Sequence, residues 1–199
     1  RSRLDGNLKL TAPAPERGAS MSSEDTTRSL LIEGSDLVGG LYASGLLSLS
    51  LQRTLLHHRC YLARHVLALE LVDSQFDGDI DCSGVRFHAE VKIFGCQINR
   101  QFRACETHFQ KLSIQATHCI GNGLFSGSSF HGPVSFSPRI QPGEDQTEGP
   151  GHRRGYTYFR HQLDCNETVF HRGADFSCLI IERIGNFSGA KFSAEAKFR

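Results

Sequence analysis

Four residues in the first third of the chain have the types and spacing of a metal site. They are His57, His58, Cys60 and His65, in the segment LLHHRCYLARH. Imidazole nitrogen and thiolate sulfur are ligands that Zn²⁺ prefers. Alternate residues of a strand face opposite ways, however, so these side chains would not converge on an extended segment. We predict no metal and no cofactor, and expect Cys60 to be a buried filler that stacks on Cys82.

Acidic side chains alternate in the segment FDGDIDC, at Asp77, Asp79 and Asp81. Three carboxylates on one surface could bind a cation or cleave a polysaccharide by acid–base catalysis. The same alternation is typical of a polar outer strand face, and we favour that interpretation. No GxSxG, Walker, HExxH or dinucleotide-binding motif accompanies them. The sequence therefore predicts a protein that is not an enzyme.

Three histidines recur at related positions, because His88, His131 and His171 each follow a phenylalanine. We expect them to lie along one side of the molecule. Such a row could titrate near pH 6.5 and sense pH. A row of solvated histidines without a function is the simpler interpretation.

The segment 137–158 departs from any regular pattern and contains Pro138, Pro142 and Pro150. Proline interrupts both strands and helices. Long loops on a rigid scaffold frequently carry binding residues, so one interpretation is a recognition loop. The other is an insertion that the fold tolerates and that has no role. The residues that would make the contacts of a recognition loop are Arg139, Arg153, Arg154, Tyr156 and Tyr158.

An eleven-residue repeat indicates which elements position all these residues. Three consecutive units are FDGDIDCSGVR, which starts at Phe76, then FHAEVKIFGCQ and INRQFRACETH. Large apolar residues alternate five and six residues apart, which fits neither a helix nor an amphipathic hairpin. The pattern resumes in phase after segment 137–158. The large residues that we expect to face inward include Phe87, Ile93, Ile98, Phe109, Phe130, Phe136, Phe159, Phe170, Phe176, Ile181, Phe187, Phe192 and Phe198.

This alternation is typical of a β-solenoid, in which short strands end at sharp corners that favour glycine. Two units would make one four-sided coil, and equal positions of successive coils would lie ~4.8 Å apart. Phe87 would then stack on Phe109, and Phe170 on Phe192. The predicted fold is all-β, a right-handed parallel β-helix with a quadrilateral cross-section, about 22 residues per coil and roughly seven coils.

The clearest units, NFSGAKFSAEAKF and GVRFHAEVKIFGCQI, resemble the pentapeptide-repeat family. Members of that family carry a central Leu or Phe with a small residue two positions earlier, and they form right-handed quadrilateral β-helices. The resemblance is close over 65–136 and 159–198 and looser over 32–64. Arg86 and Lys92 stand where the family often has Asp or Asn, and the coils are longer than its twenty residues. The resemblance implies the fold, and leaves the turns open.

The ends of the chain carry two further expectations. Either residues 4–10 (LDGNLKL) form a solenoid unit followed by an insertion, or residues 1–20 precede a native start at Met21. Phe198 occupies an inward position of the last unit, which predicts an uncapped coil. We therefore expect a segment of a longer solenoid, or end-to-end self-association. The predicted division is 1–31 as an uncertain N-terminal segment, 32–136 as coils, 137–158 as an inserted loop and 159–199 as coils.

Composition limits the classes of partner. The 199 residues include 22 Lys+Arg and 21 Asp+Glu, a formal charge of +1, so we expect no nucleic-acid partner. No run of about 18 apolar residues could span a membrane, and the first residues lack the pattern of a secretory signal. Seven Cys without a CxxC pair suit a reducing compartment. We expect free thiols and a cytoplasmic location.

The expected function is a non-enzymatic β-solenoid scaffold that binds an unknown protein partner through a flat side face and segment 137–158. The family resemblance implies an alternative, a topoisomerase-protection protein that imitates DNA in shape and negative charge. The near-neutral charge of this chain disfavours it. A carbohydrate-active β-helix enzyme that uses Asp77, Asp79 and Asp81 is the third possibility.

Overall fold

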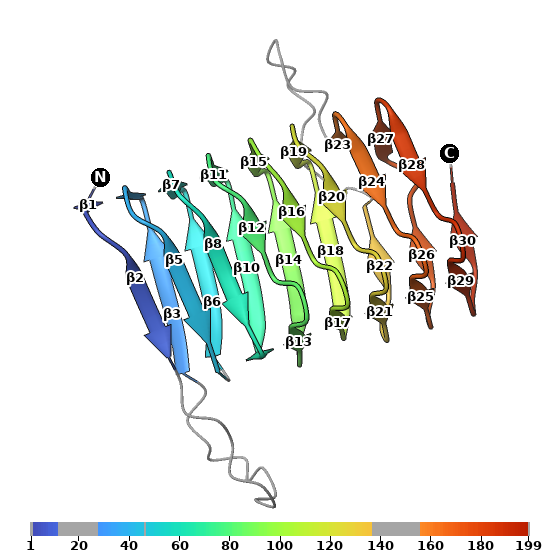
Figure 1. Ribbon diagram of the computed structural model, residues 1–199, viewed down its shortest axis with the longest axis horizontal. Coiled ribbons are helices and arrows are strands. Elements are labelled where there is room, and N and C mark those ends of the chain that lie inside the picture. The colour runs from blue at the N-terminus through green and yellow to red at the C-terminus, as the bar shows by residue number, and fades with distance from the viewer. Residues whose placement is uncertain (1, 12–27, 46, 137–155, 199) are drawn as a thin grey trace, which may run out of the picture.

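The computed structural model describes residues 2–11, 28–45, 47–136 and 156–198. Within these residues the chain forms short β-strands and no helix. Each strand pairs in parallel with strands of the neighbouring coils, so the coils stack into the rod seen from the side in Figure 1. About seven turns of roughly 22 residues are present, which confirms the predicted parallel β-solenoid.

Four parallel sheets form the sides of the rod. Sheet A contains β1 (Ser2–Leu4), β4 (Ser35–Leu37), β7 (Leu55–Leu56), β11 (Gln75–Phe76), β15 (Gln97–Ile98), β19 (His118–Cys119), β23 (Thr157–Phe159) and β27 (Leu179–Ile181). Sheet B contains β2 (Leu8–Thr11), β5 (Leu41–Ser44), β8 (Cys60–Ala63), β12 (Ile80–Asp81), β16 (Phe102–Arg103), β20 (Gly123–Leu124), β24 (Gln162–Asp164) and β28 (Ile184–Asn186). Sheet C contains β3 (Arg28–Glu33), β6 (Leu47–Gln52), β10 (Ala68–Val72), β14 (Glu90–Phe94), β18 (Lys111–Gln115), β22 (Val134–Ser135), β26 (Ala174–Asp175) and β30 (Ala196–Lys197). Sheet D contains β9 (His65–Val66), β13 (Arg86–Phe87), β17 (His108–Phe109), β21 (Ser129–Phe130), β25 (Val169–Phe170) and β29 (Lys191–Phe192).

Stacked phenylalanine rings run through the core behind sheet D. Ring centroids are 5.3 Å apart for Phe87 and Phe109, 4.8 Å for Phe109 and Phe130, and 4.9 Å for Phe130 and Phe170. Phe170 and Phe192 continue the column at 4.7 Å. The predicted pairs are therefore in contact. Because each ring lies on the one in the coil before it, the column couples successive coils through buried apolar surface.

Coil length varies along the rod. Ile80 lies opposite Phe102, a shift of 22 residues, whereas Cys60 lies opposite Ile80, a shift of 20 residues. The prediction that Cys60 stacks on Cys82 is therefore wrong. The turns before and after β9 are each one residue shorter than their counterparts around β13, as the pairs Val66↔Phe87 and Leu69↔Val91 show.

Two corners of every coil are made by residues in the left-handed backbone conformation. Glycine adopts this conformation freely, and other residues adopt it at a cost. Six of these residues are not glycine, so the predicted corner glycines supply only part of each column. The corner between sheets C and A contains Gly34, Arg53, Asp73, Gly95 and Ala116, with φ between 47° and 62°. The corner between sheets B and D contains Arg64, Gly84, Glu106, Gly127, Glu167 and Gly189, with φ between 53° and 70°.

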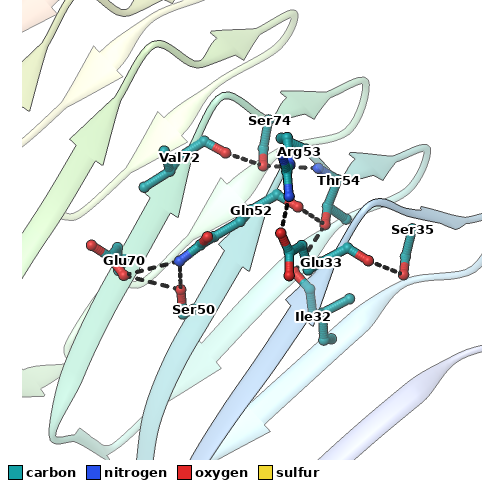
Figure 2. A network of polar contacts seen from close by, with 10 residues as sticks. All are labelled: Ile32, Glu33, Ser35, Ser50, Gln52, Arg53, Thr54, Glu70, Val72 and Ser74. Carbon is teal, nitrogen blue, oxygen red and sulfur yellow. Dashed lines mark hydrogen bonds and ion pairs between the residues drawn. The ribbon is translucent and has the colours of Figure 1, made fainter. Parts of the chain in front are cut away.

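A buried hydroxyl residue commonly follows the left-handed residue, as Figure 2 shows between sheets C and A. Thr54 Oγ1 donates to the carbonyl of Gln52 at 3.0 Å and to that of Ile32, one coil earlier, at 3.1 Å. Ser74 Oγ lies 2.8 Å from the Val72 carbonyl and accepts from the Thr54 amide at 3.1 Å. These contacts satisfy corner groups that would otherwise be buried without a partner.

The coils extend beyond the predicted boundaries. β1 and β2 pair with β4 and β5, so residues 2–11 contribute strands to sheets A and B. Sheet C begins at Arg28 rather than at Ile32, and sheet A resumes at Thr157 rather than at Phe159. At the other end, Phe198 stacks on Phe176 at 4.8 Å but is 57% exposed.

None of the described segments forms a helix long and apolar enough to cross a membrane.

Candidate functional site

Sheet C has the broadest regular outer face of the rod. Its strands β3 and β6 have six residues each, and β10, β14 and β18 have five, whereas the strands of sheet D have two. Side chains alternate between the core and solvent along these strands, so each contributes two or three outward residues in register with its neighbours. The face is therefore a regular grid of side chains on a rigid support.

An open groove of about 300 Å³ crosses strands β3, β6 and β10 on this face. Its floor is shallow because the outward residues Ser29, Ser48 and Ala68 are small and lie side by side in register. Leu31 lines the groove and is 55% exposed. Small-molecule sites are usually enclosed, so this open hollow suits a protruding side chain of a macromolecule better than a buried ligand.

Paired charges border the groove. Glu70 receives hydrogen bonds from Lys92 at 3.0 Å and from Ser50 at 3.1 Å, and Figure 2 shows the contacts of Glu70 with Ser50 and Gln52. The Lys92 hydrogen bond is the main cause that lowers the Glu70 pKa, and burial opposes it. The Lys111 ammonium lies 3.0 Å from Glu90. Both pairs join neighbouring strands and fix the polar rim of the face.

Phe94 is a second apolar group on the same face and is 41% exposed. It lies at the end of β14, beside Val72 of β10. Phe94 and Leu31 are three strand spacings apart, which corresponds to ~14 Å across the sheet. The face thus carries two exposed apolar residues separated by small and charged side chains.

The residues predicted to form a recognition loop divide into two groups. Arg139, Arg153 and Arg154 lie outside the described residues. Tyr156 precedes β23 and is 43% exposed. Tyr158 belongs to β23 itself, where its hydroxyl donates to the Glu182 carboxylate of the next coil. Tyr158 is therefore part of the outer surface of sheet A.

The structure separates the four residues with metal-site spacing. Cys60 points into the core, and burial raises the pKa of its thiol to about 12. His57 lies at the end of sheet A, with Nε2 2.9 Å from Asp36 and Nδ1 3.1 Å from Asp77. His65 lies on sheet D. Across the described residues, no group of three or more His, Cys, Asp or Glu side chains could hold a metal ion.

The three alternating aspartates stabilise corners of the coil. Asp79 accepts a hydrogen bond from the Gln101 amide at 3.1 Å. Asp77 accepts from Gln75, which is the main cause of its lowered pKa. Asp81 is buried rather than outward-facing, which contradicts the predicted exposed row. Burial opposes its ionisation, but hydrogen bonds from Ser83 and the ion pair with Arg59 outweigh burial and lower its pKa.

The histidine row is present and is longer than predicted. His131 and His171 lie side by side with ring centroids 5.0 Å apart. His88 contacts His65, and His131 contacts His108, two residues that the prediction did not include. Both contacts join residues 23 positions apart, one more than the coil length. That recurring interval is the signal in the sequence that could have revealed them.

Leu31 and Phe94 were also missed. Each occupies an outward position in an alternating strand, and only the deviation from polar character marks it in the sequence. Comparison of the chain with protein-family models, with curated proteins and with solved structures finds no match.

Proposed function

We propose that the protein is a non-enzymatic scaffold that binds a partner protein through the outer face of sheet C. The observation that carries the proposal is the pair of exposed apolar residues, Leu31 and Phe94, on the broadest regular face of the rod. Protein interfaces concentrate their affinity in a few apolar or aromatic residues that a polar rim surrounds. The Glu70–Lys92 and Glu90–Lys111 pairs supply such a rim.

The rigidity of the solenoid supports this proposal. Outward side chains of sheet C are held by strand pairing on both sides and by cross-strand ion pairs, so few rotamers are lost on binding. The face carries both signs of charge, because Lys92 and Lys111 stand next to Glu70 and Glu90. A DNA-mimicking topoisomerase-protection protein would need a more uniformly negative surface. The four-sided coils and stacked phenylalanines support a relation to the pentapeptide-repeat family, which we propose as well.

Affinity capture followed by measurement with the purified partner tests the proposal. The variant Leu31→Ser with Phe94→Ser removes both apolar residues from exposed positions, so the fold should persist. We expect at least ~10-fold weaker binding of the captured partner, which corresponds to the loss of one interface residue worth about 1.4 kcal/mol. Ile184→Ser is the matched control, because Ile184 is 58% exposed on sheet B.

A second variant that lacks residues 138–155 separates the face from the inserted segment. Partner binding should survive this deletion if sheet C provides the main contact. Equal binding by the wild type and the Leu31→Ser, Phe94→Ser variant would refute the proposal, and loss of binding in the deletion variant alone would assign the interaction to the segment.

A further inference from the structure

The histidines on sheet D form two close pairs with the same geometry. In each pair, a residue of one coil contacts a residue of the next coil that lies one step diagonally across the sheet. His65 Nδ1 is 3.1 Å from His88 Nε2, and His108 Nδ1 is 3.4 Å from His131 Nε2. These strands lie along one edge of the rod in Figure 1. The coil repeat therefore produces the same pair of imidazoles twice.

The distances between the facing nitrogens match those of two ligands on one metal ion. Two nitrogens at ~2.0–2.1 Å from a divalent ion lie about 2.9 Å apart in square or octahedral geometry and about 3.3 Å apart in tetrahedral geometry. The observed separations of 3.1 and 3.4 Å are close to this range. Small rotations of the rings would turn both nitrogens toward a common point in the solvent.

The chemical state of the rings suits coordination. In the tautomers that place the proton on the outer nitrogen of each ring, both facing nitrogens carry lone pairs. Burial, followed by the neighbouring histidines, lowers the pKa of His88 and of His131. Both rings are therefore neutral at pH 7, as a metal ligand must be. The charged group that faces the pairs is Arg86, which lies in register with His65 and His108 and opposes any added positive charge.

A third diagonal contact shows what a single imidazole lacks. Ser129 Oγ is 3.2 Å from His171 Nε2, in the position that a second histidine occupies in the other two pairs. A hydroxyl is a weak ligand for nickel or zinc beside an imidazole. This contact should not hold a metal ion by itself, so it provides an internal reference on the same sheet.

From this geometry we propose that His65 with His88, and His108 with His131, are two binding sites for divalent transition-metal ions of the nickel and zinc class. Each pair supplies two ligands, and water completes the coordination. The inference is independent of the partner-binding face, because sheet D and sheet C are different sides of the rod.

Calorimetric titration of the full chain with Ni²⁺ at pH 7.5 tests the proposal. We expect two ions that His88→Gln and His131→Gln each reduce by one, with at least ~10-fold weaker binding at the altered pair. His58→Gln is the matched control, since His58 is exposed and outside the pairs, and it should leave both ions bound. Ser129→His completes the third pair and should add one ion.

Circular dichroism of each variant checks that the solenoid persists. Two bound ions in both His88→Gln and His131→Gln would overturn the proposal. So would an equal loss in His58→Gln, or the absence of an added ion in Ser129→His together with unchanged binding in the two deletion variants of the pairs.

Discussion

Each phenylalanine in the column behind sheet D contacts rings of the coils on both sides. Phe109 lies 5.3 Å from Phe87 and 4.8 Å from Phe130, and it has no exposed surface. Truncation of such a residue loses its own transfer free energy and leaves a cavity bounded by rings that cannot collapse into it. The spacing in the sequence predicted this contact because a bulky residue every coil has one geometric explanation.

The substitution Phe109→Ala should lower the free energy of unfolding by ~3–5 kcal/mol. The matched substitution Phe94→Ala, at an exposed position of sheet C, should change it by less than ~0.5 kcal/mol. Urea denaturation followed by circular dichroism measures both values. Similar losses in the two variants would show that Phe109 does not occupy the core position described.

Other residue contacts could not be predicted from the repeat alone. The position of Cys60 opposite Ile80, and the diagonal pair of His65 with His88, both depend on coils of 20 residues in this part of the rod. A fixed repeat of 22 residues places these side chains against the wrong neighbours. Turn length is set by local backbone conformation, for which Arg64 in a left-handed conformation gives no clear signal.

At the scale of the element, the corner rather than the strand defines the coil. Thr107 follows the left-handed residue Glu106, and its Oγ1 donates to the carbonyl of Cys82 at 2.8 Å, one coil earlier. The same hydroxyl is 3.2 Å from the Cys105 carbonyl, and the Thr107 amide donates to Ser128 Oγ at 3.0 Å. One buried side chain thus ties three successive coils together at a corner.

Replacement of that hydroxyl by a methyl group isolates its contribution. Thr107→Val should destabilise the protein by about 1–3 kcal/mol, because it leaves buried carbonyl groups without their donor at nearly constant volume. Thr107→Ser keeps the hydroxyl and should cost clearly less, with only a methyl group lost. Thermal or urea denaturation distinguishes the two variants. A Thr107→Val variant as stable as the wild type would remove the hydroxyl from the account of the corner.

The sequence indicated the strands better than the corners. Large residues at inward positions are visible in the sequence, and glycine marked corners such as Gly84 and Gly95. The same corner conformation at Arg53 and Glu106 could not be predicted, because those residue types usually avoid it. The stacking of each corner on the next holds these residues in place.

At the scale of the molecule, the rod is a support whose sides carry different chemistry. Sheet C presents Leu31 and Phe94 among paired charges, and sheet D presents the histidine pairs. The overall architecture followed from the sequence because the repeat recurs over most of the chain. The interaction face did not, since outward residues do not affect the repeat and only their register, known from the strand pairs, groups them.

The most direct test of the stacked coils is disulfide trapping across sheet C. Ser50 and Glu70 lie opposite each other on neighbouring strands, and Lys92 lies opposite Glu70 one coil further on. In a protein that carries Ser50→Cys and Glu70→Cys, the two Cα atoms are within the ~4.4–6.8 Å that a disulfide requires. A protein that carries Ser50→Cys and Lys92→Cys places them about two strand spacings, or ~9.6 Å, apart. Mild oxidation and peptide mapping by mass spectrometry should find the first disulfide in high yield and not the second. Equal yields, or a preference for the Ser50–Lys92 disulfide, would contradict the solenoid register.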